Sequence, residues 1–178
     1  MDDFIKGQGH AFLAHLLRRL ADDFVRDVAL WYPTIGIKAP PRTHSTMLLL
    51  SLHGELGVTE IAGFLRQSHP LVLTWIRQLK DLGFVHTRHD PNDGRRSIVF
   101  LTPLGREDLL LHKKADAIAA RAYDELMHEV DAPVFEALWR MEAACRRRPF
   151  LDRLQDVSLS VAPAVRGKPR QPHGSRCA

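Results

Sequence analysis

The fold of this chain is decided by residues 89–105, which read HDPNDGRRSIVFLTPLG. Asp93-Gly94 is a strong hairpin signal, because glycine accepts a positive φ without strain. The segment therefore predicts one short strand from Val85, a tight turn, and a second strand to Leu101. Two arginines follow the glycine, and guanidinium groups at a hairpin tip suit contact with phosphates or a narrow minor groove. By itself, this pattern fits a solvated surface hairpin equally well.

Two helices in quick succession are predicted upstream of the hairpin, between residues 58 and 82. Thr59 is the expected N-cap of the first helix, because its hydroxyl can accept an orphan backbone N–H. A turn at residues 66–68 follows, where Ser68 can cap the second helix. Gly83 is the stop signal of that second helix.

The second helix carries an apolar stripe on one side. Val72, Ile76 and Leu79, with Trp75 beside them, recur at helical spacing. A short helix, a three-residue turn and a longer helix with an apolar inner face are typical of a helix-turn-helix, and the arginine-tipped hairpin makes it a winged one. In that arrangement the second helix enters the major groove, and the wing contacts the DNA backbone or the minor groove.

The order of these residues resembles the MarR family of bacterial transcriptional regulators. The resemblance covers roughly residues 8–155, and its specific part is 58–105. It rests on Ile61-Ala62, Leu65, Ser68-His69-Pro70, Val72, Ile76, Leu79, the run from Leu82 to Val85, the run from Asp90 to Arg96, Leu101-Thr102 and Gly105. The resemblance implies a mainly α fold with a small β-hairpin, in which N- and C-terminal dimerisation helices flank the winged helix-turn-helix. It also implies a homodimer that binds double-stranded DNA, and a small, often aromatic, effector between the two regions.

The resemblance further implies which residues contact DNA. Asp93-Gly94-Arg95 matches the family's Asp-x-Arg wing element, in which the arginine reaches the minor groove and the aspartate orients it. Arg96 is then a backbone contact or a salt-bridge partner. The surface of the recognition helix that would face DNA matches Ser68, His69, Pro70, Leu73, Thr74 and Arg77.

Two positions depart from the family pattern. Arg66-Gln67 occupies the turn where the family usually has a glycine and an apolar residue, and Leu73 replaces a commonly polar position. Because leucine cannot hydrogen-bond base edges and can only contact a thymine methyl group, we expect DNA shape to carry more of the sequence specificity.

The flanking segments are predicted to be helical. Helices are expected over about residues 10–32, 44–56 and 103–129, with helical spacing continuing to residue 154 after a break at 131–133. Gly57 is the expected stop of the second of these helices, and Thr102-Pro103 is the start signal of the third. The terminal helices hold more apolar residues than a small domain can bury, which favours dimerisation through them. An intramolecular helical bundle is the alternative.

Length and composition indicate how the chain is divided into a domain and a tail. Its 178 residues suit one domain, residues 1–157, with a DNA-binding core at about 44–105. The segment 158–178 is rich in prolines and glycines and holds four basic residues and no acids, which predicts a disordered basic tail. The formal net charge of the whole chain is +4, so the folded part is neutral and its net charge is no evidence of DNA binding.

Local charge is more informative than the total. Residues 66–96 hold six basic side chains against three acidic ones, and a dimer would double this excess on one face. The tail could add nonspecific affinity for phosphates, because cationic side chains release counterions from DNA.

Other chemistry-bearing residues favour structural roles. His10 with His15 and His86 with His89 are candidate metal-binding pairs, but the ten histidines form no compact cluster with ligand spacing, so no metal or cofactor is expected. Cys145 is expected to pack on an apolar helix face. The alternative is a redox sensor, because three arginines follow it. Trp31 and Tyr32 could line an effector pocket or belong to the core.

The sequence predicts a homodimeric, sequence-specific DNA-binding transcriptional regulator that represses from a roughly palindromic site. Nucleophile motifs, phosphate-binding glycine loops and paired carboxylates are absent, so an enzyme is not expected. A cytoplasmic location is expected, because the sequence has neither a long apolar run nor a signal-peptide pattern. The alternative function is a winged-helix module that binds a protein partner without reading DNA, which Leu73 and the neutral folded part favour.

Overall fold

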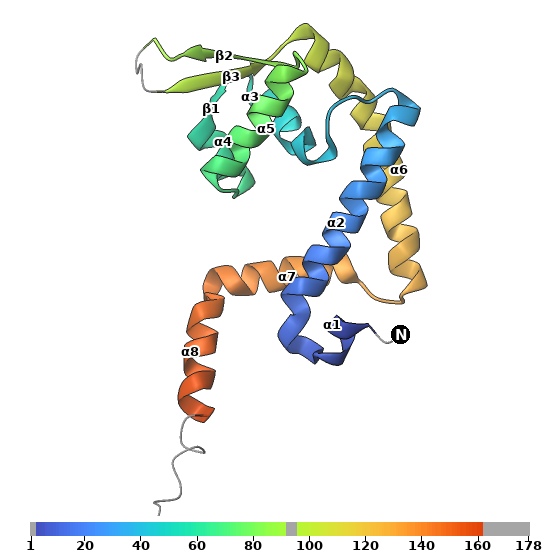
Figure 1. The fold of residues 1–178 in the computed structure, drawn as a ribbon, viewed down its shortest axis with the longest axis vertical. Helices are drawn as coiled ribbons and strands as arrows, with labels where there is room; N and C mark the ends of the chain where they lie inside the picture. The colour runs from blue at the N-terminus through green and yellow to red at the C-terminus, as the bar shows by residue number, and fades with distance from the viewer. Residues whose placement is uncertain (1–2, 92–95, 162–178) are drawn as a thin grey trace, which may run out of the picture. The chain divides into compact units, whose positions relative to one another are not determined.

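The computed structural model describes residues 3–91 and 96–161, and it arranges them as a winged helix-turn-helix with further helices on both sides in sequence (Figure 1). The chain divides into two compact units, and the boundary between Arg121 and Ala122 falls inside a long helix. The mainly helical fold with a small sheet is confirmed. The predicted wing residues Asp93 and Arg95 lie outside the described residues.

The first unit begins with α1 (Phe4–Gly7), a 3₁₀ turn (Gly9–Phe12) and α2 (Leu13–Trp31). The helix expected over residues 10–32 is therefore α2, with its predicted first turn in a 3₁₀ conformation. A second 3₁₀ turn, Tyr32–Ile35, ends at Gly36, whose φ of 84° only glycine adopts readily.

The helix expected over residues 44–56 ends three residues early. α3 spans His44–His53 and stops at Gly54, which has a φ of 79°. The prediction that Gly57 ends this helix is therefore wrong. The next residues form the short strand β1 (Leu56–Gly57), which pairs with β3. This pairing provides hydrogen-bond partners for backbone groups that follow the end of the helix.

The two strands of the predicted hairpin are confirmed, and its predicted turn at Asp93-Gly94 lies outside the described residues. β2 (Val85–His89) pairs antiparallel with β3 (Ser97–Leu101), so that Val85 lies opposite Leu101 and His89 opposite Ser97. With β1 on the other side of β3, the described sheet has the order β1-β3-β2. Val85, Val99 and Leu101 turn inward and are buried, which fixes the register of the wing against the helices.

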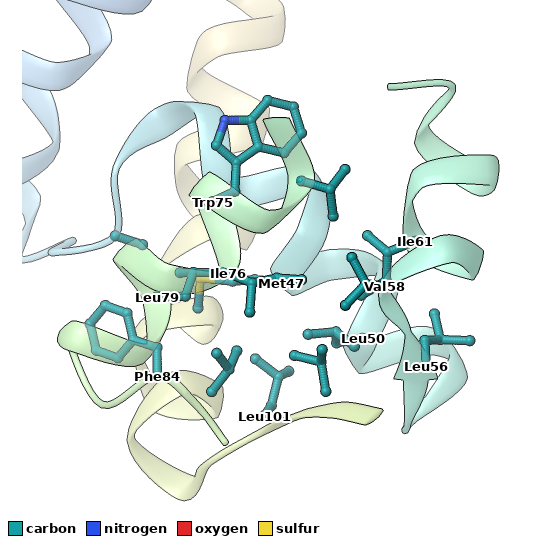
Figure 2. Close-up of a cluster of buried hydrophobic side chains, with 14 of the residues drawn as sticks. Met47, Leu50, Leu56, Val58, Ile61, Trp75, Ile76, Leu79, Phe84 and Leu101 are labelled. Atoms are coloured by element: carbon teal, nitrogen blue, oxygen red, sulfur yellow. The ribbon is translucent and has the colours of Figure 1, made fainter. Parts of the chain in front are cut away.

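The helix-turn-helix consists of α4 (Val58–Leu65) and α5 (His69–Asp81). The predicted stripe of Val72, Trp75, Ile76 and Leu79 is buried. Figure 2 shows Ile76 and Leu79 beside Met47 of α3 and on the side of Leu101 of the sheet, whereas the ring of Trp75 points away from the sheet. The core of this domain lies between these elements, and it comprises Ala39, Met47, Leu50, Leu56, Val58, Ile61, Ala62, Val72, Trp75, Ile76, Leu79, Phe84, Val85, Val99 and Leu101.

The two helix starts differ from their predicted caps. Gly57, not Thr59, occupies the N-cap of α4, because the Glu60 carboxylate already accepts the backbone N–H of Gly57 at 2.7 Å. Ser68 occupies the N-cap of α5 as predicted, although its side chain makes no capping hydrogen bond. In the turn between the helices, Arg66 adopts the left-handed conformation (φ 51°) that glycine adopts without strain.

The long helix α6 (Pro103–Glu129) begins where the sequence predicts. The Thr102 hydroxyl accepts the N–H of Gly105 at 3.0 Å and donates to the carbonyl of Gly83 at 2.7 Å. An added Cβ on Gly105 would lie 2.1 Å from the Phe84 carbonyl oxygen. The first turn of α6 is therefore held directly against the backbone that follows α5.

The second unit contains the end of α6, α7 (Val134–Arg147) and α8 (Phe150–Val161). The predicted break at residues 131–133 is confirmed, and Asp131 there has a positive φ of 49°. The boundary expected at Ser158 lies inside α8, and residues 162–178 lie outside the description. None of the helices that the structure describes is both long and apolar enough to span a membrane.

Candidate nucleic-acid interface

The exposed side of α5 collects five of the residues predicted to contact DNA. Pro70, Thr74 and Arg77 are exposed on the side opposite the buried stripe, and Ser68 and His69 are exposed at the N-terminal end of the helix. The Thr74 hydroxyl donates to the Pro70 carbonyl at 3.1 Å, while Arg77 forms no ion pair with any residue in the described ranges. Burial of one face fixes the helix in the domain, and the other face is left available to a partner.

Leu73 differs from these five residues. Its side chain is half-buried and packs against the domain core. It lines a hollow of about 450 Å³ with seven other residues, namely Gly57, Val58, Thr59, Glu60, His69, Arg96 and Ser97. Leu73 therefore lies at the edge of the exposed face and turns toward the base of the wing.

Arg96 occupies the position just before β3 and contacts two carboxylates. Its guanidinium bonds the Glu60 carboxylate on α4, and its Nη1 lies 3.4 Å from an Asp90 carboxylate oxygen. The salt-bridge alternative predicted for Arg96 is thus what the structure contains. Hydrogen bonds from the Gly57 N–H and then from Arg96 lower the pKa of Glu60, so this carboxylate is charged at neutral pH.

The local excess of positive charge is smaller than the sequence count indicates. Arg88 bonds Glu55 at 2.5 Å, and Arg96 is paired with acids. Arg77 and Lys80 are the exposed cations of α5 that have no ion pair within the described residues. The count missed Glu55 and Glu60 because both precede residue 66. The position of Glu60, three residues after the N-cap, is a recognisable capping signal.

A second polar cluster, which the sequence did not indicate, lies between α3 and α6. The Nδ1 atoms of His44 and His112 are 3.1 Å apart, and His112 Nε2 is 3.4 Å from Asp108. Asp108 also accepts the backbone N–H groups of Lys38 at 2.9 Å and Ala39 at 3.3 Å. Burial, and then the neighbouring His44, lower the pKa of His112.

The hydrogen bonds of this cluster indicate its tautomers. If His112 donates from Nε2 to Asp108, its Nδ1 accepts, and His44 donates from Nδ1. His44 Nε2 is then an acceptor, and it is buried without a hydrogen-bond partner in the described structure. Beside it runs a largely apolar groove of about 400 Å³, lined by His44, Leu48, Ser51, Arg106, Glu107, Leu109, Leu110, His112, Lys113 and Asp116.

Most of the other candidate binding and sensing residues have structural contacts. His15 stacks on Phe12, and His86 packs edge-on against Phe100. Within the described residues, no group of three or more potential ligands is placed to hold a metal ion. Tyr32 is buried in a small second core rather than in the groove. The expectation that Cys145 packs on an apolar helix face is wrong for the single chain, in which Cys145 on α7 is exposed.

Comparison with known proteins matches this geometry. Residues 41–97 match the sequence model of the MarR family. Among curated proteins, no sequence match is found. A probable transcriptional regulator from Pseudomonas aeruginosa has a similar structure, with a TM-score of 0.59 at 22% identity over 72% of this chain and 96% of that one.

Two further solved structures share the fold. The S. aureus MepR–DNA complex gives a TM-score of 0.60 at 19% identity, over 74% of this chain and 96% of MepR. The PcaV regulator from Streptomyces coelicolor, solved with its natural ligand, gives 0.56 at 21% identity, over 82% of this chain and 98% of PcaV. The segment 41–97 thus matches the MarR family model, and the chain shares its winged-helix fold with these three solved structures.

Proposed function

We propose that this chain is a sequence-specific DNA-binding transcriptional regulator that inserts the N-terminal half of α5 into a major groove. One observation carries the proposal: α5 has a fully buried apolar face and, opposite it, an exposed polar face that includes the unpaired Arg77 in the described structure. A major groove admits a helix of this kind, and residues at its N-terminal end reach base edges. MepR, which shares the fold, is solved bound to DNA.

The contacts fall into two groups. Ser68, His69, Thr74 and Arg77 carry hydrogen-bonding groups suited to phosphates and base edges, whereas Pro70 and Leu73 offer apolar contact. Asp93 and Arg95 of the wing complete the proposed surface, with Arg95 in the minor groove. Because Leu73 is partly packed in the domain, DNA shape contributes strongly to specificity.

We propose that the chain acts as a homodimer. α2 exposes Leu13, Leu16, Leu17 and Leu20, and the second unit exposes Phe135, Leu138, Trp139, Phe150, Leu151 and Leu154. Apolar residues concentrated in this way mark surfaces that a partner covers. A twofold pair would place two α5 helices on half-sites about 34–36 Å apart, on a pseudo-palindrome. Light scattering should give twice the chain mass of 20.2 kDa.

We further propose that DNA binding represses transcription and that a small aromatic effector releases the repressor. The groove beside His44 supports this, because its lining combines leucines with cationic Arg106 and Lys113, beside Glu107 and Asp116. An aromatic carboxylate could pair with these cations and lie on the leucines. PcaV is solved with a natural ligand. Benzoate should raise the melting temperature and weaken DNA binding of the parent, and Lys113→Gln should reduce both effects.

The decisive experiment measures binding of the full chain to the DNA upstream of its own gene, over a series of salt concentrations. A DNA-binding protein loses affinity steeply with salt, and Arg77→Ala should weaken binding further. The matched control is Arg18→Ala, because the Arg18 side chain is 86% exposed on α2. Binding that is indifferent to salt and to Arg77→Ala would instead favour the protein-interaction module.

A further inference from the structure

We infer that Arg96 is a positioning residue: through Glu60 it ties the base of the wing loop, where β2 ends and β3 begins, to the start of α4, and it does not itself bind a phosphate. The inference rests on the proposed DNA binding, and it concerns how the wing is held for that purpose. The three residues Gly57, Glu60 and Arg96 are called the wing latch below.

The base of the wing is closed by backbone and side chain together. The N–H of Asp90, just after β2, donates to the carbonyl of Arg96 at 2.9 Å. The side chains of the same two residues also form an ion pair, with Arg96 Nη1 3.4 Å from Asp90 Oδ2. Asp90 is almost wholly buried, so its carboxylate holds the arginine from a fixed position.

Glu60 connects this base to the helix-turn-helix. Its Oε2 atom accepts the backbone N–H of Gly57 at the N-cap of α4 and also bonds the guanidinium of Arg96. One carboxylate oxygen therefore joins the first turn of α4 to the strand that returns from the wing. Both hydrogen bonds lower the pKa of Glu60, so the latch is charged at neutral pH.

Gly57 provides the space for this contact. Its backbone has φ −74° and ψ 154°, a conformation that any residue adopts, so the turn itself does not require glycine. A Cβ at this position would lie 2.7 Å from Arg96 Nε and 3.2 Å from Nη2. A side chain here would push the guanidinium away, and the absence of one lets Arg96 lie across the helix start.

The arrangement gives Arg96 a different role from its neighbour in sequence. Arg96 already faces two carboxylates, which neutralise its charge and compete with any phosphate. Arg95, the predicted minor-groove residue, directly precedes this anchored position in the sequence. A fixed Arg96 restricts where the preceding residue can be placed, so the latch contributes to DNA affinity by pre-organising the wing.

The latch and simple electrostatics predict opposite changes in DNA affinity for one substitution. Glu60→Gln removes a negative charge close to the proposed DNA surface, so simple electrostatics predicts tighter binding. The latch predicts the reverse, a loss of about three- to tenfold per dimer, as expected for breaking two exposed ion pairs. Gly57→Ala keeps both charges, displaces only the guanidinium, and should cause a similar loss. When either substitution is added to Arg96→Gln, the double variant should bind DNA as well as Arg96→Gln alone.

The salt dependence separates positioning from contact. If Arg96 binds a phosphate, Arg96→Gln should reduce the slope of log affinity against log salt by about 0.9 per subunit. Positioning predicts a lower affinity with an unchanged slope. The matched control is Arg88→Gln on β2, which breaks the 2.5 Å pair with Glu55, the residue before β1, and should leave affinity unchanged.

A measurement without DNA keeps the latch testable by itself. The Asp90 amide proton should exchange faster in Glu60→Gln and in Gly57→Ala than in the parent, while the core amides of α5 keep their protection. Failure of the parent to bind DNA would overturn the proposed function and leave this exchange result standing. Unchanged Asp90 exchange, tighter binding by Glu60→Gln, or a reduced slope for Arg96→Gln would each overturn the latch.

Discussion

The Nδ1 atoms of His44 and His112 lie 3.1 Å apart, a distance that accommodates one proton between the two rings and not two. His112 is 1% exposed, and the ring of Tyr32 packs edge-on against it. Asp108 and Asp116 face the pair from α6, while Lys113 and Arg106 line the same groove. The contact joins α3, which belongs to the helix-turn-helix core, to α6.

Acidification should destabilise the chain through this pair. The pKa of His112 is lowered from 6.5 in the folded protein, so below pH 6.5 the unfolded chain binds more protons than the folded one. This contribution to stability is complete above pH 6.5 and is lost as the pH falls toward the lowered value. Urea denaturation at pH 7.5, 6.5 and 5.5 measures it. His112→Gln should flatten the dependence in this range, and parallel curves for parent and variant would contradict the assignment.

Gly105→Ala should be strongly destabilising, because the new Cβ would lie 2.1 Å from the carbonyl oxygen of Phe84 and neither backbone can yield easily. We expect a loss of about 3 kcal/mol in the free energy of unfolding, at the upper end for overpacking. Gly63→Ala is the matched control, since its Cβ meets nothing within 4 Å on α4. That substitution should stabilise the chain by up to about 1 kcal/mol. Equal effects of the two would show that α6 is not pressed against Phe84.

Asp108→Ala should loosen the segment before α3. The carboxylate accepts the backbone N–H groups of Lys38 and Ala39, so a part-buried donor and a buried donor would both lose their partner. The expected cost is about 2–4 kcal/mol in the free energy of unfolding, because unsatisfied buried donors keep their full desolvation penalty. Thermal denaturation beside the exposed neighbour variant Glu107→Ala checks this. A cost below about 0.5 kcal/mol would show that solvent replaces the carboxylate.

Leu79→Ala should remove a fully buried side chain from the inner face of α5. We expect a loss of about 2–5 kcal/mol in the free energy of unfolding, from lost burial and the cavity left behind. Leu82→Ala, at a leucine that is 40% exposed just after α5, should cost far less. Chemical denaturation of both variants makes the comparison, and similar losses would argue against the packing in Figure 2.

Local signals in the sequence were enough for most of the fold. The glycine turn predicted the hairpin, the apolar stripe predicted the buried face of α5, and Thr102-Pro103 predicted the start of α6. Each signal acts over a few residues. The end of α3 was wrong because two glycines, Gly54 and Gly57, could both stop a helix, and pairing of β1 with distant Val99 decides between them.

The polar network of the site was not predictable in this way. Glu60 and Arg96 are 36 residues apart in sequence, and His44 and His112 are 68 apart. Periodicity shows which face of an element is buried, but it does not show which residue lies opposite. Counting charges along residues 66–96 therefore overstated the free positive charge, because Glu55 and Glu60 reach that surface from outside the segment.

The Thr102 hydroxyl bonds both the Gly83 carbonyl and the Gly105 amide. Because Thr102 directly follows β3, these two bonds join the segment after α5, the end of β3 and the start of α6. This junction lies at the end of the β2–β3 ladder where Val85 pairs with Leu101. Loss of the Thr102 hydroxyl would therefore loosen three elements at once, so this position tolerates little variation other than serine.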